Sequence, residues 1–353
     1  MRPKRFLIYQ REGMGRMSVA ETKRLTVVII GYQASDIYWR RCIQSVLRNI
    51  GPDDEVICID DGSREKPIVI SEFAKQDNRI LPVLCSENRG QAFARNVGLE
   101  RARCKYVAFV DCDDEVVPST YANAISELDA SGFDVAVYGV RTVWISARLE
   151  KENTAEPERI GEMTAEKLAQ IYHNCLFCYP WNKIYRRKFL LDNGIMFKEH
   201  CIPREDEVFN LDCVVANAKW VMISNVGHVY YRYDGSSLSR YRRYCDESTR
   251  MVKASWGKCR RILPEGQRFL EGIEEESEEE IAKANWENLW RRGSPYSMYG
   301  RWKWLRSHNE LGGCCFYIKT AVFMFLRRYF YFSVIQRMHI RKIWPEAKEL
   351  STN

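Results

Sequence analysis

The stretch KYVAFVDCDDEVVP, residues 105–118, places three carboxylates directly after a short apolar run. They belong to Asp111, Asp113 and Asp114, and like charges a few ångströms apart repel one another. A divalent cation such as Mg²⁺ or Mn²⁺ relieves that repulsion, because hard cations prefer carboxylate and water oxygens as ligands. Residues i and i+2 of an extended strand point to the same side, so we expect Asp111 and Asp113 to face one ligand together.

Two further acidic groups occur along the chain. Asp60 and Asp61 follow the apolar run EVICID, and Glu205, Asp206 and Glu207 form a triplet. Taken singly, each group is ordinary, because an Asp-Gly turn commonly follows a strand and acidic triplets are usually solvated surface. Their meaning therefore depends on the elements that position them.

Strand and helix patterns alternate through the first part of the chain. Short, continuously apolar runs predict buried strands, and apolar residues spaced i, i+3, i+4, i+7 predict amphipathic helices. The expected strands are residues 25–30, 55–60, 79–85, 105–110 and 133–140. The expected helices are residues 37–49, a helix starting near Pro67, residues 88–103 and residues 119–131. This alternation predicts a mostly parallel α/β sheet, in which ligands bind at the carboxyl ends of the strands, where two of the acidic groups lie.

Five motifs follow one another in a set order. They are DDGS at 60–63, NRGQAFARNVGL at 88–99, DCDD at 111–114, WNKIYRRKFL at 181–190 and REDEVFN at 204–210. Together they resemble the inverting family-2 glycosyltransferases of the bacterial surface-polysaccharide type, over about residues 25–240. The resemblance implies the GT-A nucleotide-diphospho-sugar transferase fold, Rossmann-like, with a mostly parallel mixed sheet and helices on both faces. A helical C-terminal region is expected to follow it.

The activity that the resemblance implies is glycosyl transfer with inversion. A sugar would move from a nucleotide-diphospho-sugar, such as a UDP-sugar, to a hydroxyl of a glycan or lipid-linked acceptor. The product would be a cell-surface polysaccharide of the capsule, exopolysaccharide or O-antigen type. Residues 30–33 read IGYQ where typical members read PTYN, so the choice of nucleotide base stays open.

The resemblance also implies a donor site around Asp60–Asp61 and the DCDD motif. Asp113 would bind the divalent metal, Mn²⁺ or Mg²⁺, and Asp111 would bind either the metal with its water or the ribose. Asp61 would accept an N–H of the base, and Tyr32 would stack on that base. Arg95 would either pair with phosphate or form a structural ion pair. Asn88 would contact the donor, and Asp60 and Asp114 would be supporting carboxylates.

Transfer to a hydroxyl also needs a base that removes its proton during the attack. The resemblance assigns this role to Asp206, and the like charges of Glu205 and Glu207 would raise its pKa. The remaining supporting residues, near the acceptor or the diphosphate, are Trp181, Asn182 and Arg240.

The 353 residues divide into three expected regions. Residues 1–24 are basic without apolar periodicity, which favours a disordered arm. Residues 25–245 form the transferase domain, in which the polar stretch 150–163 is expected to be a loop or lid. Residues 246–353 are expected to be helical, basic and aromatic, and either pack on the domain or lie on a membrane surface.

The sequence also bears on the compartment. No signal-peptide pattern is visible, and thirteen cysteines at irregular spacing favour free thiols in a reducing compartment. Residues 173–178, HNCLFC, lack a second ligand pair for zinc, so buried structural cysteines are the default there. We therefore expect a cytoplasmic protein, peripheral on the inner face of the cell membrane if its C-terminal region binds lipid.

Three other functions have weaker support in the sequence. A nucleotidyltransferase would place a glycine-rich basic loop after the first strand, whereas GYQASD has one glycine and no basic residue. A non-catalytic nucleotide-sugar-binding protein on the same fold remains an alternative, because a fold alone does not establish an activity. Nucleic-acid binding has no support beyond the net charge of +7, since no recognised binding motif occurs.

Overall fold

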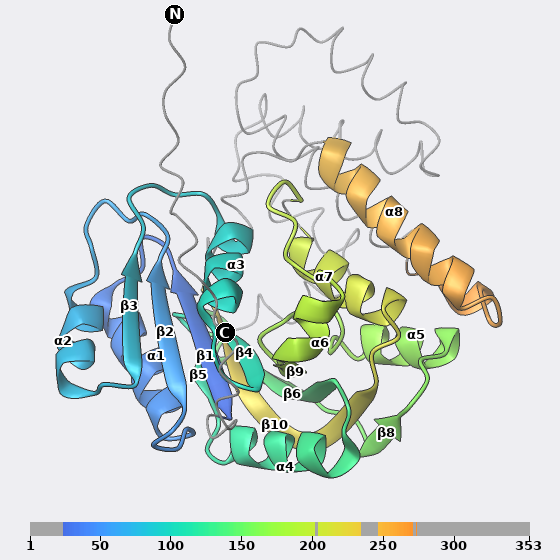
Figure 1. Ribbon diagram of the computed structural model, residues 1–353, viewed down its shortest axis with the longest axis horizontal. Coiled ribbons are helices and arrows are strands. Elements are labelled where there is room, and N and C mark those ends of the chain that lie inside the picture. Colours follow the sequence, from blue (N-terminus) through green and yellow to red (C-terminus); the bar gives the residue numbers. More distant parts are fainter. Residues whose placement is uncertain (1–23, 202–203, 234–245, 271–272, 274–353) are drawn as a thin grey trace, which may run out of the picture.

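The computed structural model describes residues 24–201, 204–233, 246–270 and Ile273 (Figure 1). A single mixed sheet runs through this part of the chain, with helices against both of its faces. The strand order is β3-β2-β1-β4-β9-β6-β10-β5, with β7 paired to β6 and β8 paired to β10. The strands are β1 (Leu25–Gly31), β2 (Glu55–Asp60), β3 (Ile80–Leu84), β4 (Tyr106–Asp111), β5 (Glu115–Val116), β6 (Val135–Trp144), β7 (Leu149–Asn153), β8 (Glu158–Ile160), β9 (Lys183–Arg186) and β10 (Trp220–Arg232).

Helices connect most of these strands. They are α1 (Asp36–Leu47), α2 (Ile68–Gln76), α3 (Gln91–Arg101), α4 (Thr120–Ser131), α5 (Ala165–His173), α6 (Arg187–Asp192), α7 (Glu205–Val215) and α8 (Asp246–Ile262). None of the described helices is both long enough and apolar enough to cross a membrane.

The strand directions bring the carboxyl ends of β1, β2 and β4 to one edge of the sheet. These strands pair in parallel, with Gly31 opposite Asp60 and Ile30 opposite Asp111. Strand β9 then pairs antiparallel with both β4 and β6, and β6 pairs in parallel with β10. The acidic groups that follow β2 and β4 therefore lie at the same edge, as the strand and helix pattern predicts.

Each face of the sheet carries its own apolar cluster. Helices α1, α2 and α4 cover one face, where Trp39 and Ile43 of α1 are fully buried. Helices α3, α5, α6, α7 and α8 cover the other, where Phe209 of α7 and Trp256 of α8 are fully buried. Helix α3 approaches β1 closely at Gly98, since a Cβ there would lie 2.2 Å from Val28 Cγ1. This approach brings the first turn of α3 to the carboxyl edge.

The predicted elements mostly form, with two corrections. All five expected strands are present, but the helix expected at 88–103 begins only at Gln91, since residues 88–90 form a loop at Asp61. The stretch 150–163 is not simply a loop or lid, because it contributes to β7 and contains β8. Strand β7 pairs with the part of β6 that extends past the apolar core, and β8 is only three residues long with Ile160 as its one buried residue. Neither strand therefore gives a visible apolar alternation.

The outer regions are described only in part. Helix α8 begins where a helical C-terminal region was expected, but the arm 1–23 and nearly all residues beyond 270 lie outside the described residues. The three-region division therefore stays a prediction.

Candidate active site

Asp61 organises the loop between β3 and α3. Its carboxylate accepts hydrogen bonds from Asn88 Nδ2 at 2.7 Å and from the backbone N–H groups of Arg89 at 3.0 Å and Gly90 at 2.7 Å. Gly62 makes this contact possible, because it has φ of +75° and a Cβ there would lie 2.1 Å from the carbonyl carbon of Glu87. Asn88 thus binds Asp61 itself, and a carboxylate with about four acceptor positions keeps about one for a ligand.

Asp60 and Tyr32 lie on either side of that loop. Asp60 is fully buried and accepts hydrogen bonds from Lys66 Nζ at 3.0 Å and from the hydroxyl of Ser63. Ser63 in turn accepts the backbone N–H of Gln33 at 2.8 Å, which ties the end of β1 to the end of β2. Tyr32 is 45% exposed at this junction, so its ring is free to meet a ligand while Asp60 holds the turn.

The DCDD motif forms a turn. Strand β4 ends at Asp111, and the backbone N–H of Asp114 donates to the carbonyl of Asp111 at 3.0 Å. The expectation that Asp111 and Asp113 share one side of an extended strand is therefore wrong in its geometry. Burial, together with repulsion from Asp114 and Asp111, raises the pKa of Asp113 to about 7.

Helix α1 holds this turn in place through several side chains on one face. Arg41 donates to the carbonyl of Asp113, and the thiol of Cys42 donates to the carbonyl of Asp111 at 3.6 Å. One turn further along, the hydroxyl of Ser45 accepts the backbone N–H of Val116 at 3.1 Å. Sequence reasoning did not find this contribution, although polar residues at 41 and 45 in an otherwise buried face were a visible signal.

Asp114 faces away from the turn into the protein. It is fully buried, pairs with His228 Nε2 at 3.0 Å and accepts the backbone N–H of Tyr231 at 3.0 Å. Burial raises the pKa of Asp114 and lowers the pKa of His228 to about 3. Asp114 therefore links β10 to the DCDD turn. It does not act as a negative charge at the N-terminus of the next helix, because α4 begins only at Thr120.

Arg95 connects the DCDD turn to the acidic triplet at residues 205–207. Its side chain is only 1% exposed, and it donates to Asp111 Oδ1 at 3.0 Å and to Asp206 Oδ1 at 2.6 Å. Glu205 Oε1 lies 3.7 Å from the same guanidinium. Of the two alternatives for Arg95, the structure contains the ion pair, and that pair joins the end of β4 to the start of α7.

The three carboxylates in the first turn of α7 point to three different neighbours. Glu205 is 1% exposed and accepts a hydrogen bond from Gln91 of α3. Glu207 is also 1% exposed, and it binds Arg204 Nη1 and Trp256 Nε1, each at 2.8 Å. Asp206 lies between them and is the most accessible, with a side chain 18% exposed. Burial raises the pKa of Asp206, while the guanidinium of Arg95 opposes that rise.

The WNK motif lies inside the protein beside α7. Trp181 is 3% exposed and stacks on the His228 ring, with 4.4 Å between ring centroids. Asn182 Nδ2 donates to the carbonyls of Leu176 at 3.1 Å and Tyr138 at 3.3 Å. These contacts give both motif residues a structural task, and Arg240 lies outside the described residues.

The donor atoms suit a hard cation in type. Asp111 and Asp113 supply carboxylate oxygens. Burial raises the pKa of Asp113 most, and the charges of Asp114 and Asp111 raise it further, so a cation would offset that repulsion. Within the described ranges no group of three or more His, Cys, Asp or Glu side chains could hold a metal ion. The two carboxylates therefore suffice only if diphosphate and water oxygens complete the coordination, as is usual for Mg²⁺.

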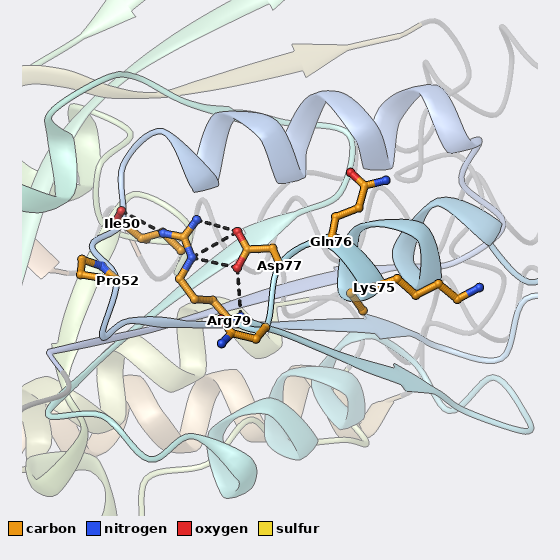
Figure 2. Close-up of a pocket in the computed structure, with 8 residues that line it drawn as sticks. Ile50, Pro52, Lys75, Gln76, Asp77 and Arg79 are labelled. Carbon is orange, nitrogen blue, oxygen red and sulfur yellow. Dashed lines mark hydrogen bonds and ion pairs between the residues drawn. The ribbon is translucent and has the colours of Figure 1, made fainter.

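A shallow hollow of about 680 Å³ lies at the opposite edge of the sheet (Figure 2). It is lined by Ile50, Pro52 and residues 74–79, near the amino ends of β2 and β3. Lys75, Asp77 and Arg79 are the charged residues there, and the Arg79 guanidinium already binds Asp77 at 2.6 Å and the carbonyl of Gly51 at 3.1 Å. The hollow therefore holds none of the sequence-predicted site residues.

Comparison with known proteins shows which family the chain resembles. Residues 26–193 match the family model described as Glycosyl transferase family 2. Residues 26–193 thus form a region of the glycosyltransferase family 2 type. It is 29% identical over 232 residues to the uncharacterized glycosyltransferase EpsJ of Bacillus subtilis, a match that covers 63% of this chain and 66% of EpsJ. It is 28% identical over 260 residues to the succinoglycan biosynthesis protein ExoO of Rhizobium meliloti, covering 72% and 73%.

Solved structures place this chain among GT-A folds. The crystal structure of Staphylococcus aureus TarS 1–349 in complex with UDP-GlcNAc matches with a TM-score of 0.57 and 23% identity. The match covers 67% of this chain and 66% of that one, and at this identity it shows the fold alone. The chain thus spans just under two thirds of the length of EpsJ and of this TarS fragment.

Proposed function

We propose that this glycosyltransferase transfers a sugar, with inversion, from a UDP-sugar to a hydroxyl of a glycan or lipid-linked acceptor in cell-surface polysaccharide synthesis. The observation that carries the proposal is Arg95, which joins the DCDD turn to Asp206 within one ion-pair network. The name of ExoO, a succinoglycan biosynthesis protein, supports the polysaccharide, and the UDP-GlcNAc bound to TarS supports the nucleotide.

In the proposed reaction the donor binds along the carboxyl edge. The exposed ring of Tyr32 stacks on the base, and the remaining acceptor position of Asp61 takes a base N–H. Asp111 and Asp113 would hold a Mg²⁺ or Mn²⁺ ion, which neutralises the charge that develops on the departing diphosphate.

Asp206 acts as the general base. The acceptor oxygen attacks the anomeric carbon, the bond from that carbon to the diphosphate oxygen breaks, and the hydroxyl proton passes to the Asp206 carboxylate. One displacement from the face opposite the diphosphate inverts the anomeric centre. Arg95 keeps Asp206 ionised, because a cation 2.6 Å from the carboxylate favours its charged form.

One experiment tests the donor and the base together. UDP-, GDP- and dTDP-sugars are screened by thermal shift with and without Mn²⁺ or Mg²⁺, and release of nucleotide is followed with a lipid-linked glycan as acceptor. We expect a UDP-sugar with metal to stabilise the protein, by about 2.7 kcal/mol at a hundred times its Kd. Asp206→Asn should keep that binding and lose about 10²- to 10⁴-fold in turnover.

The exposed carboxylate Asp53, on the opposite edge, provides the matched control as Asp53→Asn. Loss of donor binding in Asp206→Asn with turnover intact would contradict the assigned base. Donor binding without turnover by the unaltered protein, across glycan acceptors, would favour the non-catalytic alternative, and absence of any nucleotide-sugar binding would reject the donor site. A cytoplasmic location at the membrane face remains part of the proposal, tested by fractionating cells.

A further inference from the structure

Four aromatic rings form a stacked group beside α7. Trp181 stacks on Tyr179 with 4.7 Å between centroids and 15° between planes, on His228 at 4.4 Å and 18°, and on Tyr230 at 5.4 Å and 25°. His228 and Trp181 are buried, whereas Tyr179 is 40% exposed. The group therefore starts in the protein interior and ends in an aromatic ring at the surface.

The buried end of this group is fixed to the DCDD turn. His228 pairs with Asp114 at 3.0 Å, and Asp114 is the last residue of that motif. Rings within a stack have little freedom to tilt, because each is packed on its neighbours. The exposed Tyr179 ring is consequently held in a set position relative to the turn that carries Asp111 and Asp113.

The backbone of Tyr179 is also tied to the helix that carries Asp206. Asn210 Nδ2 donates to the carbonyls of Asp206 and Cys178, each at 3.1 Å. Lys183 Nζ, fully buried, donates to the carbonyl of Tyr179 at 2.5 Å. The Asn210 amide therefore links the carbonyl of Cys178, the residue before Tyr179, to the carbonyl of Asp206.

We propose that the Tyr179 ring is the platform on which a pyranose ring of the acceptor stacks, with its hydroxyl turned toward Asp206. This inference rests on the proposed function and names its acceptor class. An aromatic face carries negative partial charge, and it attracts the C–H groups that line one face of a pyranose. A preformed ring platform adds affinity because little side-chain freedom is lost on binding.

The same geometry disfavours an open-chain acceptor. Two similar proteins are named for action on poly(ribitol-phosphate), whose polyol unit is linear. A linear polyol has no flat C–H face, so it gains little from a stacked tyrosine. The exposed ring therefore favours a glycan acceptor built of sugar rings over a polyol-phosphate chain.

The test uses small probes and the full chain. Methyl β-D-glucopyranoside, methyl β-D-galactopyranoside and ribitol 5-phosphate are each added to the protein with UDP and Mn²⁺, and binding is read by saturation-transfer NMR. We expect at least one pyranoside to bind and ribitol 5-phosphate to bind more weakly. Tyr179→Ala should weaken pyranoside binding about fivefold to tenfold, while Tyr179→Phe should keep it.

Two controls keep the result interpretable. Leu149→Ala removes another exposed apolar side chain, 56% exposed on β7, and should leave pyranoside binding unchanged. Thermal melting checks that Tyr179→Ala folds, and Tyr179→Phe, which keeps the ring, tests the platform even if Tyr179→Ala unfolds. Equal pyranoside binding by the unaltered protein and a folded Tyr179→Ala, or tighter binding of ribitol 5-phosphate, would overturn the platform.

UDP binding measured in the same samples separates the two proposals. If UDP binds with metal and no pyranoside does, the platform is rejected and the proposed donor chemistry stands. If pyranosides bind through Tyr179 and no nucleotide binds, the platform stands and the proposed function fails.

Discussion

Arg95 favours the ionised form of the Asp206 carboxylate. It is buried and lies within 3.0 Å of Asp111 and of Asp206, so one cation is shared by two anions from different elements. Burial raises the pKa of Asp206 and Arg95 opposes the rise. A base whose pKa lies above that of an ordinary aspartate, about 3.9, is better matched to proton transfer near neutral pH.

This pairing predicts the pH dependence of turnover. Asp206 must be ionised to accept a proton, so kcat should fall as pH drops through its raised pKa. Arg95→Gln removes the charge that favours the carboxylate, and the acid limb should move upward by about one pH unit. Arg95→Lys keeps the charge and should move it less. An acid limb at the same pH in all three proteins would show that Asp206 is not the titrating base.

Motif order predicts which residues form this site, but it does not predict their contacts. The fold brings Asp61 and Asp111 to one edge because parallel strands end there, and Arg95 joins Asp111 to Asp206 of α7. The partner of a side chain is a different matter. Asn88 reads as a donor contact but binds Asp61, since the positive φ of Gly62 brings the two together. Such a contact depends on backbone geometry that residue types do not specify.

At the scale of elements, the DCDD turn is held from two sides. Helix α1 binds its backbone through Arg41 and Cys42, and β10 binds Asp114 through His228 and Tyr231. The turn is therefore rigid while its carboxylates repel one another. Rigidity that preserves an unfavourable charge arrangement is a common property of functional sites.

Substitution of Asp113 and of Asp114 in the DCDD motif should change the free energy of unfolding in opposite directions. Asp114→Ala leaves His228 Nε2 and the Tyr231 N–H without their hydrogen-bond partner, which costs about 1–3 kcal/mol per group in the free energy of unfolding. Asp113→Ala removes a carboxylate whose pKa is raised by burial and by repulsion from Asp114 and Asp111, and should maintain or increase stability. Urea denaturation at neutral pH measures both.

Ligand binding should show the reverse order. Asp113→Ala should lose Mn²⁺-dependent UDP binding, as EDTA treatment of the unaltered protein should, while correctly folded Asp114→Ala should retain more of it. Exposed Asp53→Asn again provides a control for loss of a carboxylate. The same unfolding free energy for both variants would contradict the structural role given to Asp114.

Element boundaries were predictable where apolar residues mark them. Strands β1, β2 and β4 are buried along their length and appear as continuous apolar runs. Strand β7 is exposed over most of its length and lies alongside the part of β6 that extends past the core, so its polar composition resembled a loop. Pairing there comes from the backbone of a neighbour, which composition does not reveal.

On the scale of the whole molecule, the sheet separates two apolar clusters. Ile43 of α1 lies in one and Ile57 of β2 lies in the other, and both are fully buried. A layered α/β arrangement of this kind was expected from the alternation of strands and helices. Strand order was not, because β9 enters antiparallel between β4 and β6 through long-range contacts that no local pattern encodes.

The separation predicts additive effects across the sheet. Ile43→Val and Ile57→Val should each lower the free energy of unfolding by about 0.5–1.5 kcal/mol. The double variant should lose the sum to within about 0.5 kcal/mol, since the two side chains pack in different clusters. Denaturant titration measures all three proteins, and a double variant far from the sum would mean that the sheet transmits packing changes between its faces.

The contact between Arg95 and Asp206 has a consequence for the order of events in a catalytic cycle. After each proposed transfer Asp206 carries the acceptor's proton, and a neutral carboxyl attracts a guanidinium far less than a carboxylate does. The link between α3 and α7 would then be weakest while products are still bound, and it would strengthen again once that proton leaves to water. Product release and readiness for the next donor would in this way follow from a single deprotonation.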